Sequence, residues 1–146
     1  MSRTRSRPFA NSAVLPVPDS ERLWRIVDIS YDGLDELPFG AVVVDYGGNI
    51  VAYNQYEARM AHKDAQAVIG RNFFHDIAPC TAVKAFEGRM YEFIKSKERV
   101  SESFDYFFPF AHGSVDVTIT FLKLAGKEQI LIAIERVEKI PVGVPV

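Results

Sequence analysis

Cysteine and tryptophan are both scarce in this chain of 146 residues, which has one of each. A single cysteine cannot form an internal disulfide bond, and a chain without a disulfide or a secretory signal fits a reducing cytoplasm. The longest unbroken aliphatic run, residues 130–134, falls far short of the roughly 20 apolar residues that a membrane-spanning helix needs. We therefore expect a cytoplasmic protein that does not interact with a membrane.

Motifs of several enzyme classes are also missing from the sequence. There is no Walker A loop, no GxGxxG and no GxSxG, and the three histidines do not have the spacing of metal ligands. A nucleotide-dependent enzyme, a hydrolase and a metal centre are therefore unsupported. We expect a protein that is not an enzyme and holds no metal.

Charge is distributed unevenly along the chain. The net charge is −2, but Arg3, Arg5 and Arg7 lie in the first seven residues, which leaves 14 basic against 19 acidic residues in the remainder. A mildly acidic body argues against a nucleic-acid partner. The arginine-rich tip is expected to be a solvated tail.

The composition predicts one folded domain between two loose ends. Residues 1–18 are rich in proline, arginine and serine and predict a flexible leader, and residues 19–33 predict a short helical cap. The domain itself is expected over residues 34–138, followed by a flexible end at 139–146. With 48% apolar residues, a domain of this size can bury its own core.

Within the domain, two strands joined by a glycine turn are followed by short helical segments, one longer helix and three further strands. Because tight turns join antiparallel neighbours, this order predicts an α+β fold with a five-stranded antiparallel sheet. The sheet is flanked by short helices and one longer connecting helix, an order typical of PAS domains. The expected strands are residues 41–45, 50–53, 100–108, 115–121 and 130–137.

Two segments carry candidate chemistry, and the first contains Tyr53 and Glu57. If Asn54 opens a helical turn, the two side chains converge on one point. A phenol and a protonated carboxyl can both donate a hydrogen bond to one anionic oxygen, and burial raises the pKa of a glutamate. The alternative is a packed tyrosine at a strand end beside an exposed helical glutamate.

The second segment contains Cys80, which lies between Pro79 and Thr81 just ahead of the longer helix. A thiol at a helix start has a lowered pKa and is more easily acylated. The alternatives are an inert buried thiol and a redox sensor, which would lack a resolving cysteine within the chain.

Together these segments resemble the photoactive yellow protein family, whose pattern they follow without a gap from Phe39 to Phe86. The resemblance extends over about residues 34–137, and the most specific part is APCT with YNxxE upstream. The matching residues are Phe39-Gly40-Ala41, Asp45, Gly48-Asn49-Ile50, Tyr53-Asn54, Glu57, Val68-Ile69-Gly70, Asn72-Phe73-Phe74, Asp76, Ala78-Pro79-Cys80-Thr81 and Phe86.

The resemblance implies a blue-light photoreceptor that carries p-coumaric acid (4-hydroxycinnamic acid) as a thioester on Cys80. Tyr53 and protonated Glu57 would donate hydrogen bonds to the phenolate oxygen of this chromophore. Light would isomerise it from trans to cis, Glu57 would transfer its proton, and the N-terminal cap would loosen in signalling. The remaining implied binding residues are Lys63, Pro79, Thr81, Phe108 and Phe110.

Three positions depart from the family pattern. Ala61 stands where a threonine hydroxyl is usual, Lys63 replaces an arginine, and Phe110 replaces a frequent tyrosine. The changes at Ala61 and Lys63 predict an altered absorption and recovery rate, and they keep open a pigment-free PAS sensory or protein-interaction module. In either case we expect a monomer or weak dimer that signals to an unidentified downstream protein.

Overall fold

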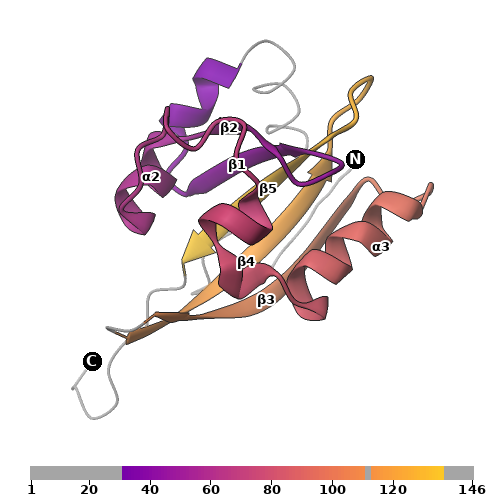
Figure 1. The fold of residues 1–146 in the computed structure, drawn as a ribbon. Helices are drawn as coiled ribbons and strands as arrows, with labels where there is room; N and C mark the ends of the chain where they lie inside the picture. Colours follow the sequence, from indigo (N-terminus) through magenta and orange to yellow (C-terminus); the bar gives the residue numbers. More distant parts are fainter. Residues whose placement is uncertain (1–30, 111–112, 137–146) are drawn as a thin grey trace, which may run out of the picture.

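The structure is a computed structural model, and it describes residues 31–110 and 113–136. The expected leader (1–18), most of the expected cap (19–33) and the expected C-terminal end (139–146) lie outside the described residues. The described part forms one antiparallel sheet with helical segments against it (Figure 1).

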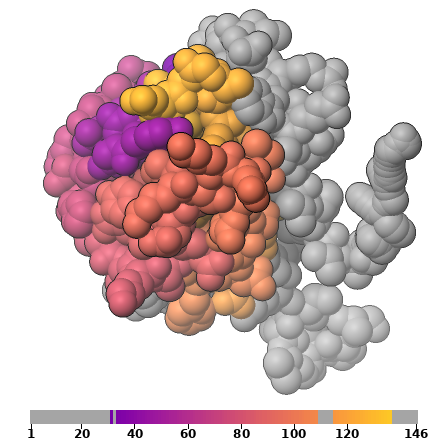
Figure 2. Space-filling model, turned by 90° about the vertical axis from the view of Figure 1, so that its right-hand side faces the viewer, coloured from indigo at the N-terminus to yellow at the C-terminus, as the bar shows by residue number. Residues whose placement is uncertain are grey.

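The sheet has five strands in the order β2-β1-β5-β4-β3, and each neighbouring pair is antiparallel. The predicted α+β fold is therefore confirmed, with strands that differ from the expected bounds by a few residues. β1 and β5 pair at the centre although they lie far apart in the sequence, and Figure 2 shows the earliest and latest described segments side by side. The strands are β1 (Gly40–Asp45), β2 (Ile50–Tyr53), β3 (Ser101–Phe110), β4 (Gly113–Lys123) and β5 (Gln129–Arg136).

The helical segments between β2 and β3 are short, as the sequence predicts, except for one continuous stretch. That stretch begins as a π-helical turn at Lys84 and continues as α3 to Lys95, so the predicted longer helix is present. In Figure 1, α3 lies alongside β3 and β4, while α2 lies by β1 and β2. Before β1 lies η1 (Tyr31–Glu36), and the segments between β2 and β3 are α2 (Gln55–Ala61), η2 (Phe73–Ile77), η3 (Pro79–Thr81), η4 (Lys84–Gly88) and α3 (Arg89–Lys95).

Side chains alternate across the sheet and build a separate apolar cluster on each face. On one face, Val42 and Ile132 pack with the aromatic rings of the helical segments, among them Phe86, which is fully buried. On the other face, Val43 and Leu131 pack with residues from η1. The helical segments between β2 and β3 therefore share the aromatic face with the candidate site, while η1 lies on the other face.

The β1–β2 turn ties the sheet to η2. Gly48 has φ +90°, a conformation that glycine adopts without strain, and an added Cβ would press on the Phe74 ring. Its carbonyl accepts a hydrogen bond from Phe73 N–H at 2.8 Å. Asn72 then caps η2 by accepting from the N–H groups of Phe74 and His75. The turn thereby fixes where the chain of η2 crosses the sheet.

Candidate functional site

The first part of the site is the junction between β2 and α2. Tyr53 ends the strand, and Asn54 is the N-cap of α2, with its side-chain oxygen accepting from Glu57 N–H at 3.0 Å. Tyr53 and Glu57 are both buried, and they line the same pocket. The predicted helical turn at Asn54 is therefore confirmed, and the alternative of an exposed Glu57 is wrong.

Asn54 holds this junction because both polar atoms of its side chain form hydrogen bonds with backbone groups. Its oxygen also accepts from Ala41 N–H at 3.0 Å. Its amide nitrogen donates to the carbonyls of Leu34 at 2.8 Å and Phe39 at 3.0 Å. Because Asn54 is 1% exposed, these bonds do not compete with water. The start of α2, and with it the position of Glu57, is fixed to η1 and β1.

Glu57 forms a bidentate ion pair with Arg136, the last residue of β5. The two guanidinium nitrogens Nη1 and Nη2 donate to Oε1 at 2.8 Å and to Oε2 at 3.1 Å. The side chains are 6% exposed for Glu57 and 10% exposed for Arg136. This is a largely desolvated ion pair. Removing one partner of such a pair is strongly destabilising, because the other charge is left buried without a counter-ion.

Burial is the main influence on both acidic groups at this junction. Burial raises the pKa of the Glu57 carboxyl, and the hydrogen bonds and positive charge of Arg136 oppose that rise. Burial also raises the pKa of the Tyr53 phenol; the Glu57 carboxylate adds to the rise and Arg136 opposes it. Tyr53 is therefore a neutral hydrogen-bond donor at neutral pH.

The second part of the site is the short η3 turn that carries Cys80. The expected lowering of the Cys80 pKa is wrong, because burial raises the pKa of the thiol and its own backbone N–H opposes this only in part. A turn of three residues has too few aligned peptide dipoles to favour the thiolate strongly. The Tyr106 hydroxyl donates to the Cys80 carbonyl at 2.8 Å and holds the turn against β3.

These two parts face one cavity of about 380 Å³. The thiol of Cys80 lies on its lining together with the phenol of Tyr53 and the carboxyl of Glu57. Apart from Lys63, the other lining residues are apolar, so the cavity has these polar groups within a largely apolar wall. The full lining is Tyr53, Glu57, Ala61, Lys63, Phe73, Ile77, Ala78, Pro79, Cys80 and Phe108.

The remaining predicted binding residues differ in their positions. Pro79 and Phe108 line the cavity, and so does Lys63, which is exposed. Thr81 is fully buried, and its hydroxyl donates to the Ala78 carbonyl at 2.6 Å; it is not among the lining residues. Phe110 ends β3, and its side chain lies outside the described part of the chain.

Reasoning from the sequence did not predict two residues of the site, Arg136 and Tyr106. The alternation of inward and outward side chains along their strands contained a signal for each. Arg136 follows Ile132 and Ile134 at intervals of two along β5, and these isoleucines face the aromatic cluster. A charged residue at the next inward position needs a buried partner. Tyr106 likewise alternates with Phe108 on β3 and faces the same cluster.

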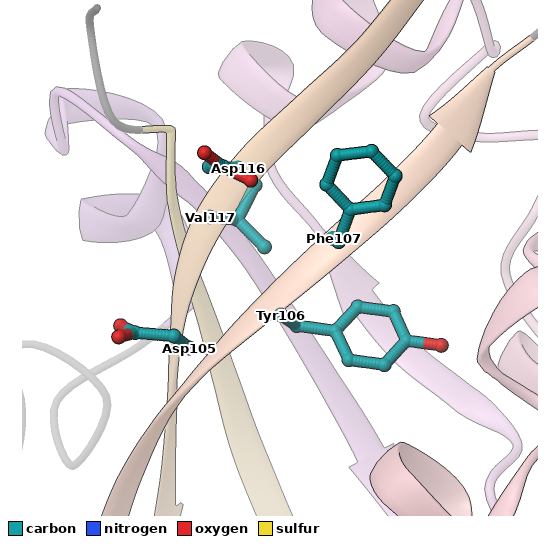
Figure 3. Close-up of a pocket in the computed structure, with 5 residues that line it drawn as sticks. All are labelled: Asp105, Tyr106, Phe107, Asp116 and Val117. Carbon is teal, nitrogen blue, oxygen red and sulfur yellow. The ribbon is translucent and has the colours of Figure 1, made fainter.

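A second hollow, of about 610 Å³, lies on β3 and β4 (Figure 3). It is lined from β3 by Asp105, Tyr106 and Phe107. From β4 it is lined by Asp116 and Val117, which lie opposite Phe107 and Tyr106 in the strand pairing. Among its described lining residues there is no predicted binding residue. The thiol, the phenol and the carboxyl of the candidate site belong to the 380 Å³ cavity.

A metal-binding cluster and a membrane-spanning helix are both absent from residues 31–110 and 113–136. No group of three or more histidine, cysteine, aspartate or glutamate side chains in these ranges is arranged to hold a metal ion. No helix in the same ranges is long and apolar enough to cross a membrane.

Comparison with known proteins identifies the family. Residues 34–136 match the PAS fold family. The photoactive yellow protein of Rhodothalassium salexigens is 33% identical over 112 residues, which cover 77% of this chain and 89% of that protein. The photoactive yellow protein of Cereibacter sphaeroides is 42% identical over 83 residues, 57% of this chain and 66% of that protein.

A solved structure agrees with the sequence matches. The photoactive yellow protein domain of the sensor histidine kinase Ppr from Rhodospirillum centenum superposes with a TM-score of 0.68 at 34% identity, over 75% of this chain and 96% of that domain. Both the fold and the sequence thus point to one group of proteins. The chain belongs to the photoactive yellow protein family of PAS-fold proteins.

Proposed function

We propose that this protein is a blue-light photoreceptor that binds p-coumaric acid as a thioester on Cys80. The observation that carries the proposal is the convergence of Cys80, Tyr53 and Glu57 on one cavity. They are the three groups that the family resemblance assigns to the attachment and to the phenolate oxygen. The family membership supports the same assignment.

The cavity fits such a chromophore in size and in chemistry. Its volume of about 380 Å³ lies within the roughly 300–1,000 Å³ usual for small-molecule sites. Phe73, Ile77 and Phe108 supply apolar surface for an aromatic ring. The Tyr53 phenol, and the Glu57 carboxyl when it is protonated, can donate hydrogen bonds, and they share the cavity with a thiol that can be acylated.

The residues have distinct roles in this proposal. The Cys80 thiolate attacks the carbonyl carbon of an activated p-coumaroyl group, a C–S bond forms, and the activating group leaves with its electron pair. Tyr53 and protonated Glu57 donate hydrogen bonds to the phenolate oxygen. When bound, the chromophore supplies absorption of blue light and trans–cis isomerisation. Glu57 then gives its proton to the phenolate oxygen and becomes a carboxylate.

Loss of this proton places a new charge in the interior, which is costly unless the charge finds a partner. The proposal therefore includes a structural response, loosening of the N-terminal cap, and a downstream signalling protein that detects it. Thermal return restores the starting state without turnover of a substrate, so the protein acts as a receptor. A reducing cytoplasm suits it, because Cys80 must remain a free thiol to be acylated.

Two lining residues tune the proposed chromophore. Ala61 offers no hydroxyl to the Tyr53 phenol, so the hydrogen bond that a threonine at this position could form is lost. Such a bond contributes about 1 kcal/mol. Lys63 carries charge without the planar guanidinium that stacks on a ring. We expect an absorption maximum and a dark recovery rate that differ from those of a variant with Ala61→Thr and Lys63→Arg.

The test is the visible spectrum of the purified protein after reaction with activated p-coumaric acid, recorded before and after a blue flash. We expect a visible band that bleaches and recovers in the dark, and a mass increase that the Cys80→Ala variant does not show. Attachment with only an ultraviolet band would mean that Tyr53 and Glu57 do not stabilise the phenolate. A wild-type protein that gains no mass would refute the proposal.

A pigment-free PAS sensory module is the second candidate, and one observation favours it. Arg136 already satisfies both oxygens of Glu57, so the cavity needs no ligand to pair this carboxylate. Under this alternative Cys80 resists acylation. The mass measurement that tests the first candidate therefore also decides between the two.

A further inference from the structure

The Arg136–Glu57 pair joins the last residue of the central strand β5 to the first turn of α2, 79 positions apart in the sequence. A guanidinium remains protonated in proteins, so Arg136 carries its charge in every state of the site. If Glu57 were neutral beside it, a buried cation would have no anion. The two hydrogen bonds, one to each oxygen, are the geometry of a carboxylate.

The backbone around the pair leaves room for this carboxylate. A Cβ added to Gly40 on β1 would collide with Glu57 Oε1, so glycine at this position lets the carboxylate lie against the strand. Asn54 fixes the helix start from the other side by binding Glu57 N–H. The position of the Glu57 carboxylate next to Arg136 is therefore built by β1, β5 and the α2 cap together.

We propose that Arg136 is the counter-ion of Glu57, and that it holds Glu57 as a carboxylate when the cavity carries no chromophore. The second part of this inference rests on the proposed function. After light has led Glu57 to give up its proton, the Glu57 carboxylate forms the ion pair with Arg136 again. Loading then transfers the phenol proton of the p-coumaroyl group to Glu57, which gives up the ion pair, and the phenolate becomes the anion of the site. The light state restores the pair.

The other ionisable groups near Glu57 do not offer an equivalent partner. Tyr53, from β2, is a neutral phenol whose pKa is raised by burial. Lys63 and Cys80 line the same cavity, but within the described residues neither forms an ion pair or a side-chain hydrogen bond with Glu57, and Lys63 is exposed to solvent. Among the described residues, Arg136 is the cation that contacts this carboxylate.

The first arm of the test uses the unloaded protein, so it does not depend on a chromophore. The side-chain carboxyl carbon of Glu57 is followed by ¹³C NMR as a function of pH and assigned with the Glu57→Gln variant. We expect Arg136→Gln to raise the Glu57 pKa by at least about one unit, a tenfold change in the ionisation constant. An unchanged titration would overturn the proposal.

A matched control and a conservative variant keep this arm decisive. Arg99→Gln removes a surface guanidinium that pairs with Glu102 at 2.7 Å, and it should leave the Glu57 titration unchanged. Arg136→Lys keeps the charge but loses the bidentate contact, so we expect a smaller rise in the same direction. If Arg136→Gln does not fold, the Lys variant decides: an unshifted Glu57 pKa would overturn the proposal.

The second arm uses protein loaded with p-coumaric acid and follows dark recovery after a flash. Without Arg136 the light-state carboxylate has no counter-ion, so we expect Arg136→Gln to recover at least about tenfold faster than wild type. Unchanged recovery would overturn the light-state role alone. If no chromophore attaches to the wild type, the proposed function fails, while the NMR titration still decides whether Arg136 is the counter-ion.

Discussion

The two polar parts of the cavity are built by different means. At the Tyr53–Glu57 junction, the buried Asn54 amide accepts a hydrogen bond from the backbone N–H of Glu57, and the nearly buried guanidinium of Arg136 donates two to the Glu57 carboxylate. At the Cys80 turn, a neutral and partly exposed thiol lies in a three-residue helix that a single tyrosine hydroxyl ties to the sheet. One part is rigid and charged, and the other is neutral and sparsely bonded.

This difference matches the demands that the proposed function makes. A group that must change its protonation state in a buried site has to be oriented before the event, since reorganising a low-dielectric interior is costly. A thiol that must be reached by a reagent needs access more than it needs fixed partners. The comparison therefore predicts that substitutions at the junction cost more stability than substitutions at the turn.

Asn54→Ala should have the largest effect on stability. The substitution removes the N-cap of α2 and the side-chain hydrogen bonds to Ala41 N–H and to the carbonyls of Leu34 and Phe39, all of them buried. We expect the free energy of unfolding in urea to fall by about 3 kcal/mol, from the cost of a lost cap together with unsatisfied buried groups.

Two companion variants make this prediction specific. Asn54→Asp keeps the accepting oxygen and should fall between wild type and Asn54→Ala. Asn49→Ala removes an exposed asparagine of the β1–β2 turn, whose amide nitrogen donates to the Asp45 carboxylate. It should lower the free energy of unfolding by much less than Asn54→Ala does. A loss of less than about 1 kcal/mol in Asn54→Ala would contradict the view that this residue holds the junction.

The same contrast explains how much of the site the sequence reveals. Tyr53, Asn54 and Glu57 are neighbours in the chain, so strand and cap rules were enough to predict their convergence. Cys80 and Phe108 could be joined to them only through the family resemblance. The partner of Glu57 could not be found from local rules, because Arg136 reaches it through the pairing of β5 with β1. Its inward position on β5 was the available signal.

The prediction for the thiol failed for a related reason. The position of Cys80 before a helix indicates a lowered pKa only when the helix is long and the thiol is solvated. Neither local pattern nor spacing reports how much of the thiol is removed from water. The structure shows that burial raises its pKa, a quantity that depends on residues brought in from β2, β3 and α2.

Acylation of Cys80 should consequently depend steeply on pH. Because the thiolate is the nucleophile and the thiol pKa is raised, the rate of attachment should increase about tenfold per pH unit, or about 100-fold from pH 6 to pH 8. The measurement is the initial rate of mass increase with activated p-coumaric acid at fixed reagent concentration.

Free cysteine with the same reagent provides the control. Its pKa is about 8.5, so its rate should level off above that pH while the Cys80 rate continues to rise. A Cys80 rate that levels off near neutral pH would show a lowered pKa and would contradict the structure at this turn.

Tyr106→Phe should have the smallest effect of these variants on stability. It removes the hydroxyl that donates to the Cys80 carbonyl at 2.8 Å and keeps the ring in the aromatic cluster. One partly buried neutral hydrogen bond contributes about 1 kcal/mol to the free energy of unfolding. Tyr56→Phe is the matched control, because within the described residues the Tyr56 hydroxyl forms no hydrogen bond. If Tyr106→Phe cost as much as Asn54→Ala, the turn would be held as firmly as the junction, and the contrast between a rigid charged part and a sparsely bonded neutral part would be lost.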